Sequence, residues 1–409
     1  MNKKDILELK RRMKKDGTTF TRLRGCYVDQ DRNKVTSFDE TFLNLEDGEF
    51  FKYLDIAKKV LSGMIGNNLL ELEFPKAEEA AGGRQQFLMG VRESALKNDA
   101  LMDSFYDWVI NNYDYVGNYL ILLFHDAYDV MTKTSDNNKL DESEEVYEYL
   151  LCAICPVKLS KPGLGYREDE NRIGPRIRDW VVGVPDTGFI FPVFTDRSTD
   201  IHSVMFYTKD TKTPHAEFME SGLGCVPKLT STEKKNSFQS IVKRVIGDAK
   251  EDDGVLMDIQ EELTDMLPLP DEQDAETAPI VVTSENISDV LKKSGISDEQ
   301  AAVIKNDYEK VFSGELPEAD ELIDRKLLER NEARKEKLQL VAQIEELTQR
   351  LENSGCEGKG GAVPDGINVS VKEEKEKEIF TQQIHGKRCI VIPIYDDEVA
   401  YINGVVKNI

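Results

Sequence analysis

Four strand-length runs of apolar residues between positions 119 and 207 restrict the fold more than any other feature of the sequence. They are Tyr119 to Tyr128, Val146 to Val157, Phe189 to Phe194 and Ile201 to Tyr207. The strongest, "YLILLF" from Tyr119, is far shorter than the roughly 20 apolar residues that span a bilayer, so it predicts a buried strand and no membrane span. Helical periodicity flanks this block, for example in residues 3–15 and 231–246. The pattern predicts an α+β fold, a mixed sheet flanked by helices.

The chain has 409 residues, and domains commonly have roughly 100–200, so we expect two or three units. An acidic, proline-bearing segment, 248–279, predicts a linker. It separates a core domain at 1–247, with a helix near Ile173 to Val182, from a small C-terminal α+β domain at 280–409. In that second domain we expect the strand at 280–284 to join the terminal sheet formed by "INVSV", "KRCIVIPI" and "VAYINGV". A long charged helix is inserted in it at about 319–358.

Charge and cysteine usage restrict the compartment and the partners. The formal net charge is -24, which repels nucleic acid at long range and disfavours it as a partner. The basic N-terminal segment lacks the apolar region of a secretory signal. Six scattered cysteines do not form the dense pattern of a secreted disulfide scaffold. We therefore expect a cytoplasmic protein with reduced thiols.

The segment "FTDRSTDIH" concentrates polar residues that could serve catalysis: Asp196, Arg197, Ser198, Asp200 and His202. If the strands on either side of it are neighbours, Thr195 to Asp200 is their connection, and strand alternation places His202 at the edge of the core. The catalytic alternative uses His202 as a general base held by Asp200, with Ser198 or a water as nucleophile. No G-x-S-x-G motif supports it, and the structural interpretation is favoured.

The motif "CAIC", Cys152 to Cys155, has a spacing that suits zinc or a redox dithiol when it lies on a turn or at the start of a helix. Here it continues a predicted strand, in which residues three apart face opposite sides. No second cysteine pair supplies the remaining ligands. We therefore predict buried structural thiols, and no metal or cofactor.

The charged helix carries a short heptad pattern. Leu340, Ile344, Leu347 and Leu351 follow a 4-3-4 spacing that is typical of a coiled-coil core. Further towards the N-terminus the pattern stops, because Lys337 and Arg330 occupy the next core positions. The helix at about 325–353 is therefore a candidate surface for self-association or for a protein partner, centred on Glu332 to Leu351.

Two predicted short helices follow the linker, with Gly295 ending the first and Ser297 with Gln300 forming a capping box at the start of the second. Their outline is that of a helix-turn-helix. The second helix opens with Asp298-Glu299, which would meet phosphates with like charge. If nucleic acid binds, the basic N-terminal helix and "EKKNSFQSIVKR" (233–244) are the expected contacts.

Several segments resemble an uncharacterised family from Clostridia and related Firmicutes, a domain of unknown function, over nearly the full length. The resemblance is carried by "RLRGCYVD", "FFKYLDIAKKVLSG", "EVYEYLLCAICPVKLSKPGLGY", "IRDWVVGVPDTGFIFPVFTDRSTDIH" and "IHGKRCIVIPI". It implies no activity and no catalytic residue. The order of elements is also similar, more remotely, to that of bacterial nucleoid-associated proteins.

The absence of a motif with catalytic spacing, together with the charged helix, favours a non-enzymatic interaction or scaffold protein. Two alternatives stay open. One is a nucleoid-associated or nucleic-acid-associated protein, and the other is a hydrolase that uses Asp200 and His202.

Overall fold

The computed structural model of the chain describes residues 1–133, 139–247, 252–267, 279–353, 378–384, 387–393, 400–402 and 405–407. Its internal contacts divide the chain into two units, Met1–Arg334 and Lys335–Ile409. The first unit contains a sheet with helices on both faces and a separate cluster of helices.

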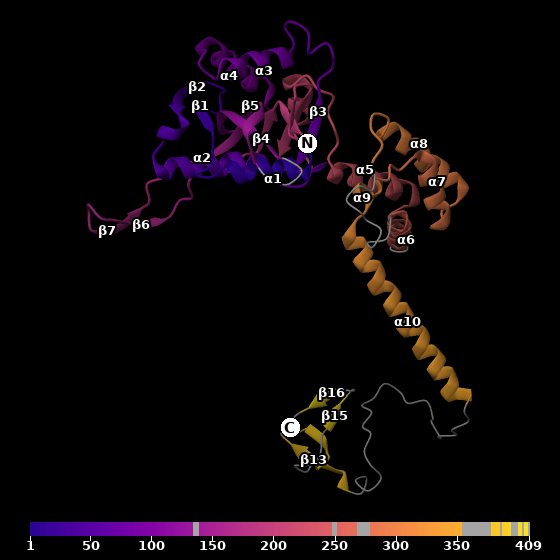
Figure 1. Cartoon of the computed structure of the whole chain (residues 1–409). Helices are drawn as coiled ribbons and strands as arrows, with labels where there is room; N and C mark the ends of the chain where they lie inside the picture. Colours follow the sequence, from indigo (N-terminus) through magenta and orange to yellow (C-terminus); the bar gives the residue numbers. More distant parts are fainter. Residues whose placement is uncertain are drawn as a thin grey trace. The chain divides into compact units, whose positions relative to one another are not determined.

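An eight-stranded antiparallel sheet forms the centre of the first unit (Figure 1). Its strands run in the order β2-β1-β4-β5-β9-β12-β3, and β8 pairs with β5 beside β9. Their bounds are β1 Phe20–Val28, β2 Lys34–Thr41, β3 Leu69–Glu73, β4 Asn118–Lys133, β5 Lys139–Leu159, β8 Trp180–Val182, β9 Thr187–Phe191 and β12 Ser203–Thr208. The expected α+β fold is confirmed, and β9 and β12 are direct neighbours.

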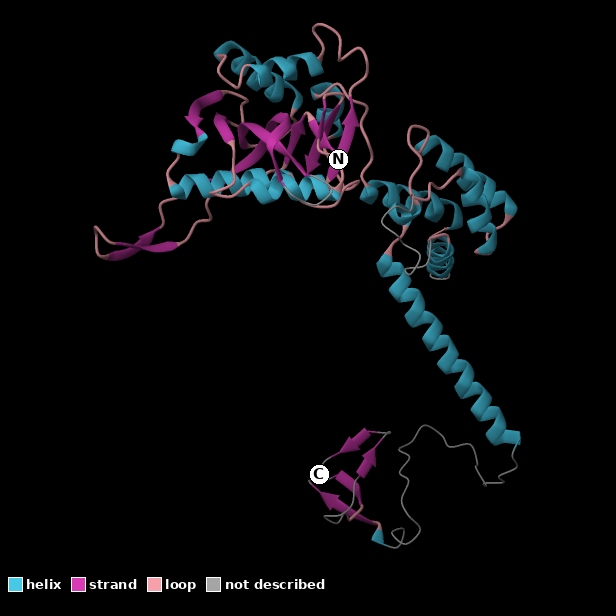
Figure 2. Ribbon diagram, in the orientation of Figure 1, coloured by secondary structure: helices cyan, strands magenta, loops and turns pink. Residues whose placement is uncertain are grey.

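Helices cover both faces of this sheet, so that the sheet is the middle of three layers (Figure 2). One face packs on α1 (Lys3–Arg12) and α2 (Asp47–Val60), with the short helix η1 (Phe42–Asn44) beside them. The other packs on α3 (Arg84–Glu93), α4 (Asp99–Asn112) and the short helix η2 (Phe218–Gly222).

The central strands are apolar at consecutive positions because both of their faces are buried. In β4, Leu120, Leu122 and Phe124 lie in the core under α1 and α2. The intervening Ile121 and Leu123 lie in the core under α3 and α4. Successive side chains of a strand point to opposite faces, so the run beginning at Tyr119 supplies both cores.

A two-stranded ribbon follows β5 and replaces the helix expected near Ile173 to Val182. It consists of β6 (Leu164–Arg167) and β7 (Arg172–Pro175), and β8 follows it. The expectation of a helix there was wrong. Pro175 cannot donate the backbone hydrogen bond of a helix interior, and β-branched residues such as Val181 and Val182 favour strands.

The second part of the first unit is helical and crosses the expected domain boundaries. Its helices are α5 (Ser231–Ile246), α6 (Asp252–Asp265), α7 (Ser284–Lys293), α8 (Asp298–Val311) and α9 (Ala319–Leu322). They share one hydrophobic core. The structure therefore divides the chain after Arg334, and not at 247 and 279.

The segment expected to be a linker contains α6, whose Leu256, Ile259 and Leu263 are buried in that core. This spacing places them on one helix face while the acids lie elsewhere. A composition averaged over the segment hides that pattern. The expected strand at 280–284 is reduced to a bridge between Val281 and Glu318.

The long helix α10 runs from Arg325 to Asn353 and continues from the first unit into the second. The second unit also contains two hairpins, β13 (Phe380–Ile384) with β14 (Lys387–Val391) and β15 (Ala400–Ile402) with β16 (Val405–Lys407). The predicted strand "INVSV" lies outside the described residues. Among the described helices, none has the length and apolar composition needed to cross a bilayer.

Candidate functional site

The polar segment 194–202 forms a small hairpin between β9 and β12. Its strands are β10 (Val193–Thr195) and β11 (Ser198–Asp200). The two turn residues, Asp196 and Arg197, have φ angles of 48° and 65°. Positive φ at both central residues is the geometry that matches the twist of a two-residue hairpin. The connection expected at Thr195 to Asp200 is therefore itself a β-ribbon.

The side chains of this hairpin point to different parts of the protein. Asn2 Nδ2 donates to Asp196 Oδ1 at 3.2 Å, and Arg197 Nη1 donates to both carboxylate oxygens of Glu8 at 2.9 Å. Arg197 thus contacts α1 itself, and Asp196 contacts the residue that caps this helix.

His202 lies outside the core, although strand alternation predicted it at the core edge. Its side chain is 66% exposed, and its Nδ1 is 2.6 Å from Glu79 Oε1. Asp200 Oδ1 accepts the backbone N–H of His202 at 2.9 Å. His202 directly precedes β12, and its ring is held by Glu79. These contacts give no support to the catalytic arrangement of His202 with Asp200.

Cys152 and Cys155 lie on opposite faces of β5. Cys152 belongs to the core under α3 and α4, and Cys155 to the core under α1 and α2. Burial raises the pKa of both thiols well above the ordinary value, so they stay protonated. Among the described residues, no group of three or more His, Cys, Asp or Glu side chains is placed to hold a metal ion.

A cluster that the sequence did not indicate joins Asp186, which precedes β9, to His215, which precedes η2. His215 Nε2 is 2.9 Å from Asp186 Oδ2, and Tyr113 Oη donates to the same oxygen at 2.9 Å. His215 Nδ1 is 3.1 Å from Glu217 Oε1. His215 also has a φ of 60°, a conformation that few residues other than glycine adopt. The imidazole is thus fixed between two carboxylates.

The electrostatics of this cluster favour a charged imidazole. Burial lowers the pKa of His215, but the hydrogen bond and charge of Asp186, and then Glu217, raise it above the ordinary value. Burial raises the pKa of Asp186, but hydrogen bonds from His215 and Tyr113 lower it to a net value below the ordinary one. The direction of both shifts favours the pairing of a charged imidazole with the Asp186 carboxylate, so this cluster fits a structural ion pair.

The cations of α5, expected as nucleic-acid contacts, are mostly paired inside the protein. Lys234 is buried, with Nζ 2.9 Å from Glu321 Oε2 and 3.5 Å from Glu315 Oε1. Lys235 pairs with Asp324, and Arg244 with Asp307. Of the four lysines and arginines there, Lys243 alone has no acidic partner among the described residues. The exposed positive charge expected on α5 is therefore small.

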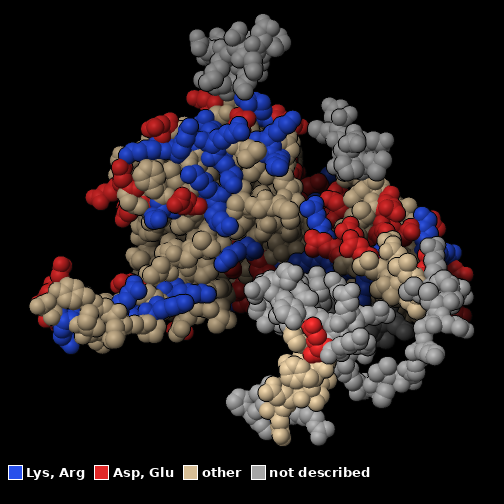
Figure 3. Space-filling model, turned by 90° about the horizontal axis from the view of Figure 1, so that it is seen from below, with Lys and Arg blue, Asp and Glu red and all other residues tan. Residues whose placement is uncertain are grey.

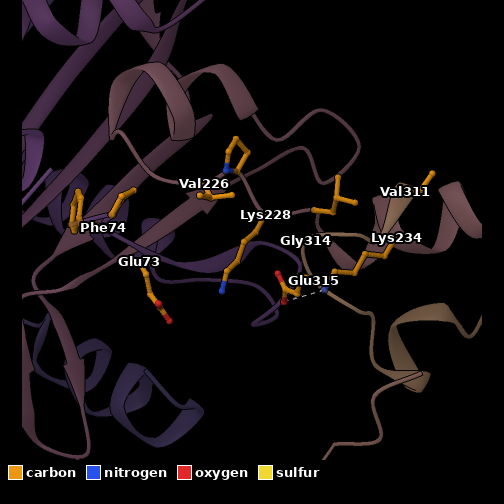
Figure 4. A pocket seen from close by; sticks show the side chains of 11 residues that line it. Glu73, Phe74, Val226, Lys228, Lys234, Val311, Gly314 and Glu315 are labelled. Atoms are coloured by element: carbon orange, nitrogen blue, oxygen red, sulfur yellow. Dashed lines mark hydrogen bonds and ion pairs between the residues drawn. The ribbon is translucent and has the colours of Figure 1, made fainter. Parts of the chain in front are cut away.

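A pocket of about 460 Å³ lies where α5 and α8 approach the end of β3 (Figure 4). Its lining combines Phe74 and Val226 with Lys228, Lys234 and Glu315. Neither His202 nor His215 lines it. Of the two lysines in the lining, Lys234 is paired with Glu315 and Glu321. Lys228 has no acidic partner among the described side chains.

The apolar stripe predicted on α10 is exposed. Leu340, Ile344 and Leu347 are 59%, 62% and 58% exposed. Val341, next to this stripe, is also exposed, as is Leu338 on the opposite side of the helix. The side chain of Leu351 lies outside the described residues. Apolar side chains that recur on one face of an exposed helix are typical of an association surface.

Comparison with known proteins identifies the family without an activity. No curated protein matches the chain. A family model described as "Domain of unknown function (DUF4317)" matches residues 1–405, nearly the full length. The chain therefore belongs to the DUF4317 family of unknown function.

Proposed function

We propose that this chain is a non-enzymatic, cytoplasmic interaction protein that associates through α10 with a second copy of itself. The observation that carries the proposal is the exposure of Leu340, Ile344 and Leu347 on one face of the helix. Each fully buried leucine or isoleucine contributes roughly 1.5–3 kcal/mol relative to the exposed state. Pairing of two such faces would therefore be favourable.

The positions around the stripe favour an antiparallel pair of helices. In a parallel pair, Lys337 of each copy would occupy a core position facing Lys337 of the other, and like charges at a core position are destabilising. In an antiparallel pair centred between Ile344 and Leu347, Leu340 faces Leu351 of the second copy. Lys337 then falls beyond the end of the apolar contact.

The test is the mass of the full chain in solution, measured by light scattering over a concentration series. One variant carries Leu340→Gln, Ile344→Gln and Leu347→Gln, and glutamine retains good helix propensity. A matched control carries Gln339→Ser, Glu345→Gln and Gln349→Ser on the other faces of α10. We expect a concentration-dependent dimer for the wild type and the control, and a monomer for the stripe variant. A wild-type chain that is monomeric throughout contradicts the proposal, as does a stripe variant that still dimerises.

The two alternative functions receive unequal support. For the hydrolase, the pairing of His202 with Glu79 leaves no observation in its favour. For nucleic-acid association, the paired cations of α5 remove one expected contact, whereas the N-terminal helix keeps its charge.

A further inference from the structure

The face formed by α1 and α2 carries lysines and arginines that have no acidic partner among the residues that the structure describes. Figure 3 shows Lys and Arg side chains gathered over this side of the sheet, in a chain with a net charge of -24. Eight of these lysines and arginines each take part in no ion pair and no side-chain hydrogen bond within the described part of the chain. We call these eight the basic face: Lys3, Lys4, Lys10, Arg11, Lys14, Lys52, Lys58 and Lys59.

These cations are unpaired because the nearby acids are used elsewhere. Asp5 accepts the backbone N–H of Asn2 at 2.8 Å, as part of the cap of α1. Glu8 accepts from Tyr128 Oη and from Arg197. Asp47 pairs with Lys15. Asp5 therefore caps α1 and Glu8 holds this helix against β4 and the β10–β11 hairpin, which leaves the outer side of α1 positive.

The remaining acids of α2 lie mostly away from its basic end. Glu46 is the residue before α2, and Glu49 is in its first turn, whereas Lys58 and Lys59 are in its last turn. Asp16 and Asp55 are exposed acids within the face. The positive charge is thus concentrated along α1 and the end of α2, which distinguishes it from the paired cations of α5.

We propose that the basic face binds the phosphate backbone of nucleic acid without sequence preference. Lysine is a flexible point charge that contacts phosphate oxygens, and such contacts supply affinity rather than base recognition. Phe51, which is 45% exposed, lies beside this face, with Lys15 Nζ 5.8 Å from its ring centroid. An exposed aromatic ring next to a cation can stack on an unpaired base.

An anionic membrane is the less suitable partner for the same charges. A helix that lies in the membrane interface buries an apolar face among the lipids. In α1 the apolar side chains Ile6 and Leu9, and Met13 just after it, are buried against the sheet. Leu7 is the one large apolar side chain of α1 exposed to solvent, at 41%. The outer side of α1 can therefore offer charge but little apolar contact.

The test measures binding of the full chain to fluorescent nucleic acid by anisotropy, with a mixed-sequence duplex and a single strand of about 30 nucleotides, between about 50 and 200 mM salt. The face variant carries Lys10→Gln, Arg11→Gln, Lys14→Gln, Lys52→Gln and Lys59→Gln. The control variant carries Lys76→Gln, Lys97→Gln, Lys212→Gln, Lys243→Gln and Lys326→Gln. All ten side chains are exposed or half-buried and have no described acidic partner, and both variants lose the same charge.

We expect salt-dependent binding by the wild type and the control, and at least about a tenfold loss of affinity in the face variant at low salt. On the duplex, the slope of log K against log salt should become shallower by about 0.9 for each phosphate that the face variant no longer neutralises. An equal loss in both variants would show that net charge alone matters, and would overturn the proposal. So would the absence of binding at about 50 mM salt, or face-dependent binding to phosphatidylglycerol vesicles without binding to nucleic acid. Circular dichroism checks that each variant is folded.

Discussion

His215 Nε2 lies 2.9 Å from Asp186 Oδ2, and the two residues are 29 positions apart in the chain. The pair joins the start of β9 to the segment before η2. Tyr113, at the end of α4, donates to the same carboxylate. The cluster therefore connects the sheet to the helical layer that contains α3, α4 and η2.

Replacing His215 should make stability depend differently on pH. The pKa of His215 in the folded protein lies above its ordinary value of 6.5. The stabilisation of the fold by the charged ring is therefore complete at pH values below 6.5. This stabilisation is lost as the pH rises through the raised pKa of the folded protein. The pKa of Asp186 is lowered from 3.8, so its contribution is lost only in acid.

The variant of choice is His215→Asn, because asparagine tolerates positive φ. We expect a loss of about 1–2 kcal/mol of unfolding free energy near pH 5.5 and a smaller loss near pH 9, measured by urea titration. His202→Asn, at an exposed histidine, is the control and should change little. A loss for His215→Asn that is equal at both pH values contradicts the ion-pair role.

Lys234 should be the most costly cation to remove from α5. Lys234→Met leaves Glu321, whose side chain is 11% exposed, without its cation, and breaking a buried pair costs about 3 kcal/mol. Adding Glu321→Gln should restore part of that loss, because the unpaired charge is then gone. Lys243→Met, on the exposed side of the same helix, should be nearly neutral. Thermal and urea unfolding of the four proteins would test this, and a neutral Lys234→Met would contradict it.

Two glycines should respond in opposite ways to alanine. A Cβ atom at Gly188, in β9, would lie 2.3 Å from the carbonyl oxygen of Cys152. Gly188→Ala should therefore destabilise the sheet by about 1–3 kcal/mol. At Gly90, in α3, a Cβ meets no atom within 4 Å, so Gly90→Ala should stabilise by about 0.5–1 kcal/mol. Urea midpoints would distinguish them, and a harmless Gly188→Ala would mean that β5 and β9 can separate.

The buried cysteines should resist alkylation in the folded protein. Burial raises the pKa of Cys26 to about 11 and that of Cys225 to about 12, and the thiolate is the reactive form. Cys152 and Cys155 should be the most protected. Mass spectrometry after treatment with iodoacetamide at neutral pH should find Cys389, which is partly exposed, modified before the four buried cysteines of the described residues. Rapid modification of Cys152, or one zinc ion per chain lost with its modification, would contradict a structural role.

Local patterns in the sequence predicted much of the secondary structure and its orientation. The helix at 231–246 was predicted and is α5. Gly295, with a φ of 81°, follows α7, and Ser297 caps α8 through the N–H of Gln300. Alternation along β5 placed Cys152 and Cys155 on opposite faces, as found. These features depend on residues close together in the chain, whose geometry is set by backbone periodicity.

The sequence by itself determined the α+β class, the helix α5 with the caps beside α7 and α8, and the opposite faces of the two cysteines. The tertiary structure alone decided which distant side chains meet. It paired His215 with Asp186 and His202 with Glu79, and it paired three of the four cations of α5 with acids. Among the described residues, it left Lys3, Lys4, Lys10 and Arg11 of α1 without an ion pair. It also placed α6 in a shared helical core rather than in a linker. Periodicity fixes the direction of a side chain along its own element, but only the packing of elements decides which charge it faces.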